Sequence, residues 1–254
     1  YTTLFRSIIS DIHANLEALR AALADIREQG ASRIICLGDV IGYGANPREC
    51  LDLAMEFDVV LRGNHEQALM TEFDGSNFNK RAKASITWTR NQLSPLGEDR
   101  EANLRRWNFL DTLPETHTEG DALFVHGTPR DPITEYLYPR DVERPKKLQA
   151  IFDRIPRVCF CGHTHMPGIW TPDMVFLSPR EVNHRYRLVK DKTIVNVGSV
   201  GQARDGDGRC CYVLFDGERI TYRKVSYDVE VTADKIRAVP ELDAFLADRL
   251  LEGR

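Results

Sequence analysis

The stretch "SIISDIHANLEAL", from Ser7 to Leu19, changes its pattern halfway along. Two isoleucines make an apolar run that stops at Asp11, and from Leu16 onward leucines recur at helical spacing. The stretch therefore predicts a strand followed closely by a helix, with Asp11 and His13 in the connection between them. A carboxylate and an imidazole at this position indicate either a solvated polar loop or a pair of metal ligands.

Strands and helices continue to alternate beyond this stretch, which favours an α/β fold with an open sheet. The first helix is predicted from Leu16 to Gln29, before Gly30. A second helix opens at Asn46-Pro47, where proline fits the first helical position. The predicted early strands are Leu4–Ser10, Arg33–Leu37, Val59–Leu61, Ala122–Val125 and Arg157–Cys161.

The later segments differ from this alternating pattern. Residues 79–112 predict two helices with no strand between them, forming a helical layer over one side of the site. From about residue 168 the chain predicts short strands, with a hairpin turn at Asp216-Gly217. Residues 232–252 predict a helical tail with a break near Pro240.

We expect a single domain with two sheets over residues 1–254, because the sequence contains no repeat and no low-complexity segment. Residues 1–7, "YTTLFRS", match the translation of a common sequencing-library adapter. We interpret them as a non-native sequence artefact and draw no function from them.

Composition excludes several classes of partner. The chain has 34 basic and 38 acidic residues and a net charge of −4, without the basic footprint of a nucleic-acid binder. No run of 18 apolar residues occurs, so we expect no membrane partner and a cytoplasmic location. We interpret the cysteines as buried apolar residues in a reducing cytosol, with a redox role for Cys159 and Cys161 as the alternative.

Polar side chains follow each predicted early strand. Five of the seven histidines fall at such strand ends, together with two aspartates and one asparagine. Ligands of open α/β sheets bind beyond the carboxyl ends of the strands, so this pattern makes Asp11 and His13 predicted metal ligands. The full predicted set is Asp11, His13, Asp39, Asn64, His126, His163 and His165.

Seven nitrogen and oxygen ligands exceed the needs of one tetrahedral zinc ion. They fit two metal ions bridged by one carboxylate, and the mixture of imidazole and carboxylate favours transition metals. We expect two divalent ions, with Mn²⁺ as the first choice and Fe, Zn, Co or Ni as alternatives. Such a dinuclear centre activates water and stabilises charge during hydrolysis.

Five short motifs carry a resemblance to a known family. The motifs are "DIH" (residues 11–13), "GD" (38–39), "GNHE" (63–66), "VHG" (125–127) and "GHTH" (162–165). Through them the chain resembles the calcineurin-like metallophosphoesterases. The phrases "SDIHANLEAL", "GDVIGYGANP" and "NVGSVGQARDG" are similar to the small prokaryotic branch of that family called YfcE-like or diadenosine-tetraphosphatase-related. The resemblance implies a four-layer α/β/β/α sandwich.

The resemblance also implies a role for each residue. His65 would protonate the leaving oxygen while a metal-bridging hydroxide attacks phosphorus in line. The substrate would be a small soluble phosphate mono- or diester or a nucleotide anhydride. The implied ligands are Asp11, His13 and His165 for one metal, Asn64, His126 and His163 for the other, and Asp39 as the bridge.

Three further residues are candidates for substrate binding, each with a structural alternative. Arg204 would clamp a phosphate, or form a surface salt bridge. Gly198 would bring a backbone N–H close to the site, or serve as a turn residue. Tyr43 would stack on a base or line the pocket, or be a loop aromatic without a ligand.

Alternative functions stay open at this point. One is a nuclease of the same superfamily, and another is a Ser/Thr-type protein phosphatase. "GDVIGYG" (residues 38–44) lacks the aspartate and arginine that follow the bridging aspartate in those protein phosphatases, which weakens the second alternative. A third alternative is a non-catalytic binding scaffold on the same fold. Formation of a homo-oligomer also stays open.

Overall fold

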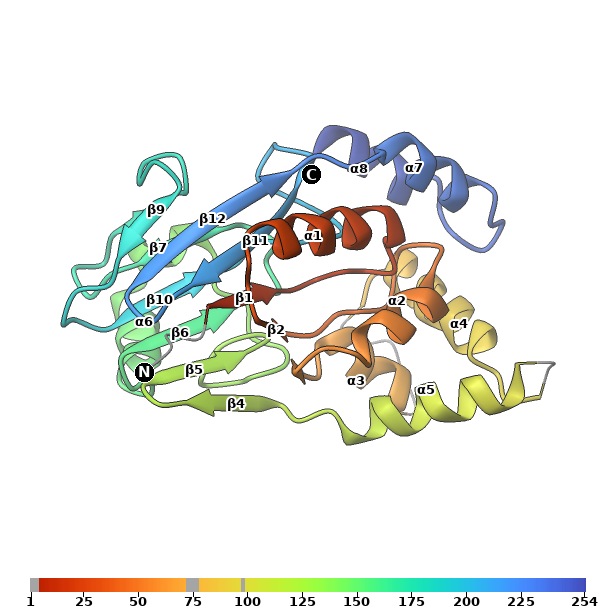
Figure 1. Cartoon of the computed structure of the whole chain (residues 1–254), viewed down its shortest axis with the longest axis horizontal. Helices are drawn as coiled ribbons and strands as arrows, with labels where there is room; N and C mark the ends of the chain where they lie inside the picture. Colours follow the sequence, from red (N-terminus) through yellow and green to blue (C-terminus); the bar gives the residue numbers. More distant parts are fainter. Residues whose placement is uncertain (1–4, 72–77, 97–98) are drawn as a thin grey trace.

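Two six-stranded sheets form the centre of this computed structural model, which describes residues 5–71, 78–96 and 99–254 (Figure 1). In the first sheet β1, β2 and β3 are parallel, and β11, β12 and β9 continue from β1 as antiparallel neighbours. In sheet order the strands are β3 (Val59–Val60), β2 (Arg33–Cys36), β1 (Arg6–Ile9), β11 (Cys210–Phe215), β12 (Arg219–Val225) and β9 (Arg185–Arg187).

The second sheet is also mixed. Its central strands β5, β6 and β10 are parallel, and antiparallel strands flank them on both sides. In sheet order the strands are β4 (Thr116–Glu119), β5 (Ala122–Val125), β6 (Val158–Cys161), β10 (Thr193–Asn196), β7 (Gly168–Trp170) and β8 (Phe176–Leu177).

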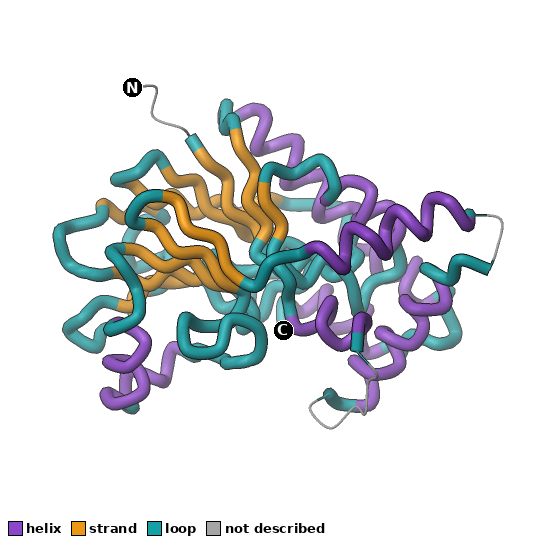
Figure 2. The backbone as a smooth tube through the Cα atoms, turned by 90° about the horizontal axis from the view of Figure 1, so that it is seen from below, coloured by secondary structure: helices purple, strands orange, loops and turns teal. Residues whose placement is uncertain are grey.

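Apolar side chains from both sheets pack between them. Phe160 of β6 stacks on Phe124 of β5 at 5.2 Å between ring centroids, and it contacts Phe215 of β11 in the other sheet at 5.0 Å. Burial of each such side chain contributes roughly 1.5–3 kcal/mol. This shared core holds the two sheets face to face, as the view from below also shows (Figure 2).

Helices complete the outer layers. On the outside of the first sheet, Leu19 and Ile26 of α1 pack with Tyr212 of β11, and on the outside of the second, Leu148 of α6 packs with Trp170 of β7. The expected four-layer α/β/β/α sandwich is confirmed. The helices of the described residues are α1 (Leu16–Glu28), α2 (Pro47–Ala54), α3 (Asn64–Met70), α4 (Lys80–Gln92), α5 (Arg100–Thr112), η1 (a 3₁₀ helix, Pro139–Glu143), α6 (Pro145–Phe152), α7 (Val229–Arg237) and α8 (Phe245–Glu252).

Local signals explain where the first helix begins and ends. The Asn15 side chain accepts the backbone N–H of Ala18 at 3.1 Å, which caps the start of α1. Gly30 follows the end of the helix with φ of +73°, a left-handed conformation that suits glycine. The helix therefore begins at the predicted residue, Leu16, and ends at Glu28, one residue before the predicted end at Gln29.

Helices α4 and α5 confirm the two helices predicted within residues 79–112, and they extend away from the sheets (Figure 1). The tail also breaks as predicted, between α7 and α8. Sequence reasoning did not identify α3, η1, α6 or β4. Among the helices of the described ranges, none has the length and apolar character that crossing a membrane requires.

The described residues also bear on two other expectations. All six cysteines are buried and free, as predicted for small apolar side chains. Of the segment 1–7, which we interpreted as an artefact, residues 1–4 lie outside the described residues. Arg6 and Ser7 are the first two residues of β1, where they pair with β2 and β11.

Candidate metal centre

The residues predicted as metal ligands meet at one end of the sandwich, where the parallel strands of both sheets end. The loop after β1 carries two of them, the loop after β2 one, and the residues after β3, β5 and β6 the others. All seven predicted ligands lie within this one cluster: Asp11, His13, Asp39, Asn64, His126, His163 and His165. All seven follow the ends of strands, in agreement with the rule for ligands of open α/β sheets.

One group of ligand atoms forms around Asp11. The Nε2 atoms of His13 and His165 are 3.1 Å apart. Asp11 Oδ1 lies 3.1 Å from His165 Nε2 and 3.8 Å from His13 Nε2. Three potential ligand atoms therefore surround one small space.

A second group forms around His126. Its Nε2 atom lies 3.0 Å from His163 Nδ1 and 3.0 Å from the side-chain oxygen of Asn64. Asp39 Oδ2 lies 3.4 Å from His126 Nε2 in this group and 3.8 Å from His13 Nε2 in the first group. Asp39 is therefore the carboxylate between the two groups.

The chemistry of these atoms fits cations. Asp11 Oδ1 is buried and has no hydrogen-bond partner among the residues that the structure describes, although His165 Nε2 is 3.1 Å away. A buried carboxylate oxygen without a hydrogen bond is costly unless a positive charge satisfies it. Nitrogen and oxygen donors of this kind suit divalent transition metals.

Backbone carbonyls fix which nitrogen of three imidazoles faces the cluster. His13 Nδ1 lies 3.1 Å from the Ile41 carbonyl, so this nitrogen carries the proton and Nε2 presents a lone pair. His163 uses Nε2 for the Thr134 carbonyl at 3.2 Å and presents Nδ1. His165 Nδ1 makes the same kind of bond to the backbone of Gln202.

Burial keeps these imidazoles neutral. Burial, together with nearby histidines, lowers the pKa of His13 and His163 well below the ordinary value. Burial and the nearby Arg204 lower the pKa of His165 to about 4. Neutral rings are the form that binds metals, so the electrostatics match a ligand role.

The pKa values of the two aspartates, Asp11 and Asp39, are shifted in opposite directions. Burial acts to raise the pKa of Asp11, but His165 and neighbouring histidines hold it well below its usual range. For Asp39, burial and then the carboxylates of Glu66 and Asp11 raise the pKa well above its usual range. An excess of buried negative charge around Asp39 is an environment that favours cations.

The backbone at this cluster is strained. Five predicted ligands have left-handed φ angles, a conformation that costs a non-glycine residue about 1–3 kcal/mol. Strain of this kind collects at functional sites. The five are Asp11 (φ +54°), His13 (+50°), Asp39 (+53°), His163 (+64°) and His165 (+59°).

Glu66 holds the loop that carries Asp39. Its buried carboxylate accepts backbone N–H groups of Asp39 at 2.8 Å and Gly63 at 2.9 Å through Oε2. Through Oε1 it accepts those of Val40 at 2.8 Å and Ile41 at 3.2 Å. Glu66 thereby joins the segment after β2 to the start of α3.

His65 lies beside the ligands. Its backbone N–H donates to Asp39 Oδ1 at 2.9 Å, and its Nε2 is 3.9 Å from Asp39 Oδ2. The ring lies 4.6 Å from Tyr43 and 5.1 Å from Phe78 between centroids, and a β-carbon at Gly42 would lie 2.0 Å from Nδ1. These contacts orient the ring, while Nδ1 finds no hydrogen bond within the described part of the chain.

The three predicted substrate-binding residues lie in different surroundings. Arg204 is near the cluster, where its charge lowers the pKa of His165, and its guanidinium donates to Gln202 Oε1 at 2.7 Å rather than to a carboxylate. Tyr43 contacts His13 at 4.7 Å between ring centroids. The N–H of Gly198 already donates to Asn196 Oδ1 at 2.9 Å, which matches the turn alternative.

Sequence reasoning assigned no role to two residues that border the cluster. Glu66 could have been found, because a glutamate three residues after a helix cap commonly bonds back to the backbone. Tyr136 stacks on His163 with ring centroids 3.7 Å apart. No local pattern marks Tyr136, because a long excursion after β5 brings it to the site.

Comparisons with known proteins find related sequences. A sequence profile for the calcineurin-like phosphoesterase superfamily domain matches residues 6–219. An uncharacterized protein of Methanocaldococcus jannaschii is 36% identical over an alignment of 262 positions, which covers 98% of each chain.

Solved structures have the same fold. A metallophosphoesterase from Sphaerobacter thermophilus superposes with a TM-score of 0.83, at 33% identity over 99% of both chains. A hypothetical protein from Pyrococcus horikoshii superposes with a TM-score of 0.76, at 19% identity over 98% of both chains, which supports the fold alone.

Proposed function

The chain belongs to the calcineurin-like phosphoesterase superfamily, and on this premise we propose that it hydrolyses a small phosphate mono- or diester or a nucleotide anhydride with two divalent metal ions. One observation carries the proposal. Asp39 Oδ2 lies 3.8 Å from His13 Nε2 and 3.4 Å from His126 Nε2, between two groups of ligand atoms. A carboxylate in this position is suited to bridge two cations.

Each group would hold one ion. Asp11, His13 and His165 would bind the first, since their ligand atoms lie within 4.8 Å of one another. The second would bind Asn64, His126 and His163, with Asp39 shared between the two. Mn²⁺ is our first choice, because the set mixes imidazole nitrogens with carboxylate and amide oxygens.

When bound, two such ions supply a more acidic water and positive charge for the phosphoryl oxygens. The chain itself supplies position, charge and a proton. Arg204, which has no carboxylate partner among the described residues, would bind a phosphoryl oxygen opposite the cluster. Water would attack phosphorus in line, and His65 would protonate the oxygen that leaves.

The surroundings of His65 suit this role when substrate is present. Burial and then His126 and His165 lower its pKa well below the ordinary value. A phosphate group beside the ring favours the protonated imidazole, because opposite charges in a buried site attract strongly. The proton would then be available at the ring nitrogen nearest the leaving oxygen.

A matrix of metals and substrates tests the proposal. The substrates are phosphomonoesters, phosphodiesters and dinucleoside polyphosphates, and the metals are added to chelator-treated protein. Chelation should abolish hydrolysis, and Mn²⁺ should restore it at least as well as Mg²⁺. Full activity in chelator-treated protein, with metal removal checked by elemental analysis, would contradict the proposal.

Adding single-stranded DNA and phosphopeptides to this matrix separates the alternatives. A superfamily nuclease would act on single-stranded DNA with binding that weakens as salt increases. A protein phosphatase would act on phosphopeptides, and a non-catalytic scaffold would hydrolyse none of the substrates with any metal. We also propose a cytoplasmic location, supported by six buried cysteines that are free of disulfides.

A further inference from the structure

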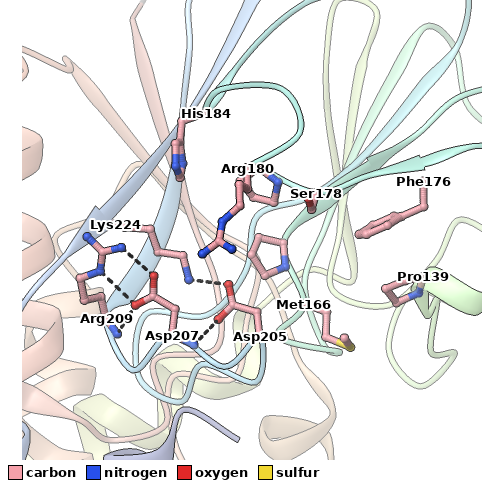
Figure 3. A pocket seen from close by; sticks show the side chains of 12 residues that line it. Pro139, Met166, Phe176, Ser178, Arg180, His184, Asp205, Asp207, Arg209 and Lys224 are labelled. Atoms are coloured by element: carbon pink, nitrogen blue, oxygen red, sulfur yellow. Dashed lines mark hydrogen bonds and ion pairs between the residues drawn. The ribbon is translucent and has the colours of Figure 1, made fainter.

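A cavity of 380 Å³ (Figure 3) is lined in part by the two loops that carry His165 and Arg204. Two of its lining residues directly follow residues of the site, since Met166 follows His165 and Asp205 follows Arg204. The backbone N–H of Arg204 bonds to the His165 carbonyl at 3.4 Å, which joins the two loops. The same pair of loops therefore borders both the predicted ligands and the cavity.

One wall of the cavity is apolar. Pro139, Met166 and Phe176 lie along this side (Figure 3). Phe176 is fixed from behind, because its ring lies 4.8 Å from that of Trp170 and a β-carbon at Gly168 would lie 2.1 Å from its Cζ atom. A rigid aromatic edge with apolar neighbours suits a flat or aliphatic group of a small molecule.

The opposite wall is charged. Lys224 Nζ pairs with Asp205 at 2.6 Å, and Arg209 pairs with Asp207 at 2.7 Å, so these charges balance. Arg180 is different, because its guanidinium points into the cavity (Figure 3) and none of the residues that the structure describes forms an ion pair with it. The positive charge of Arg180 is therefore not balanced by a carboxylate of this wall, which favours an anionic ligand.

Arg180 is held on a closed turn. The backbone N–H of Asn183 donates to the Arg180 carbonyl at 3.1 Å, and that of His184 donates to Pro179 at 2.7 Å. Asn183 and His184 have left-handed φ angles of +49° and +60°. This turn fixes where the exposed side chain of Arg180 leaves the backbone, at the edge of the charged wall.

We propose that this cavity binds the leaving group of the substrate, and that this group combines a flat, largely apolar body with a negative charge, as a nucleoside monophosphate does. The apolar body would contact Met166 and Phe176, and Arg180 would pair with the anionic group. The inference rests on the proposed function and narrows its substrate class. With ADP, water would add to the terminal phosphorus, the anhydride P–O bond would break, and AMP would remain in the cavity.

Binding is measured first, by calorimetric titration of chelator-treated protein with AMP, adenosine and inorganic phosphate. AMP should bind the wild type more tightly than either of the other two. Arg180→Gln should weaken AMP binding at least tenfold and leave adenosine binding within twofold, since only the charged contact is lost. Arg180→Lys should recover most of the AMP affinity because it keeps the positive charge.

Arg187→Gln is the matched control. Arg187 lies on β9, outside the cavity lining, and pairs with Glu218 at 3.2 Å on the exposed surface. This variant should bind AMP as the wild type does. Equal AMP affinity in the wild type and in Arg180→Gln would overturn the inference, and so would AMP binding no tighter than phosphate binding.

Kinetics then test the leaving-group role. Arg180→Gln should lose at least tenfold more kcat/KM on ADP than on p-nitrophenyl phosphate, whose leaving group carries no second phosphate. Equal losses on the two substrates would overturn this role. If the wild type hydrolyses no substrate of the metal and substrate matrix, the proposed function fails, whereas the AMP titration still decides whether the cavity is a binding site.

Discussion

Glu66 Oε2 accepts the backbone N–H of Asp39 at 2.8 Å, so a fully buried carboxylate holds the residue that lies between the two groups of ligand atoms. The contact joins the loop after β2 to helix α3, across 27 residues of sequence. Because Glu66 also accepts three other backbone N–H groups, the path of the chain around Asp39 depends on one side chain.

Glu66→Gln should therefore weaken both the fold and metal binding. An amide nitrogen cannot accept the N–H groups that one carboxylate oxygen accepts, and leaving buried donors unpaired costs about 1–3 kcal/mol. Denaturant unfolding should show this loss. Metal titration should show roughly 10–100-fold lower affinity, the usual effect of losing a residue that orients metal ligands. The exposed Glu241→Gln is the control, and unchanged values for Glu66→Gln would show that its contacts are dispensable.

Asp39→Asn should lose most bound metal and nearly all activity. The amide has almost the same shape and can still accept the His65 backbone N–H, but it lacks the negative charge that two cations would share. Elemental analysis gives the metal content per chain, and Asp121→Asn, which removes an exposed carboxylate paired with Arg157, is the control. Wild-type metal content and rate in Asp39→Asn would mean that this residue is not the bridge.

His65→Ala should retain metal and lose activity in a manner that depends on the substrate. An alkoxide leaves poorly without a proton, so kcat for an alkyl phosphate should fall by about 10²–10⁴-fold. The loss should be smaller with p-nitrophenyl phosphate, because p-nitrophenolate leaves readily unprotonated. The measurement is the ratio of the two losses at equal metal content.

Equal losses on both substrates would remove the acid role of His65 and leave it as a charged or structural residue. Loss of metal in His65→Ala would instead make it a ligand. This outcome has a structural basis, since His13, Asp39 and His65 also form a group whose ligand atoms lie close enough to hold an ion.

Acid should remove the contribution of Asp25 to stability. Arg223 binds this carboxylate with two hydrogen bonds, of 2.9 and 2.6 Å, and the Tyr212 hydroxyl donates a third. The bonds from Arg223 first, and that from Tyr212, hold the pKa of Asp25 below its ordinary value. The carboxylate therefore stabilises the fold fully above about pH 4, the unfolded pKa, and progressively less as pH falls below it.

Thermal unfolding of Asp25→Asn and the wild type at a series of pH values checks this dependence. Above about pH 4 the wild type should be more stable by roughly 1.5–3 kcal/mol, the range for hydrogen bonds to charged groups. The gap should narrow as pH falls through the folded pKa of Asp25. A gap that does not change between pH 7 and pH 2 would show that the charge of Asp25 is not what stabilises the fold.

Much of the fold could be predicted from the sequence, because the apolar runs that form strands end where the predicted metal ligands begin. The apolar run before Asp11 predicts β1 to within two residues at either end, and the leucine spacing from Leu16 predicts α1 to within one. Histidines after the strands predicted where the ligands gather, since parallel strands of one sheet end on the same side. The family resemblance assigns His13 and His165 to the same metal, and in the structure their Nε2 atoms lie 3.1 Å apart.

Other features depended on contacts that no local pattern records. Helix α3 is a short segment that begins at Asn64 and is set by the hydrogen bonds of Glu66 to a distant loop. Tyr136 reaches His163 through an irregular segment, and Arg180 reaches the cavity on a turn with strained backbone. In each case the packing of remote segments, not the local sequence, decides the position.

The left-handed backbone at Asp11, His13, Asp39, His163 and His165 has a consequence for protein engineering. Their side chains converge because the peptide chain turns in a direction that ordinary loops avoid. Copying the same seven side chains onto the strand ends of another sandwich would aim them elsewhere. A designer who wishes to transplant this centre must therefore transfer the loop backbones first, and must supply the buried glutamate that keeps one of them in place.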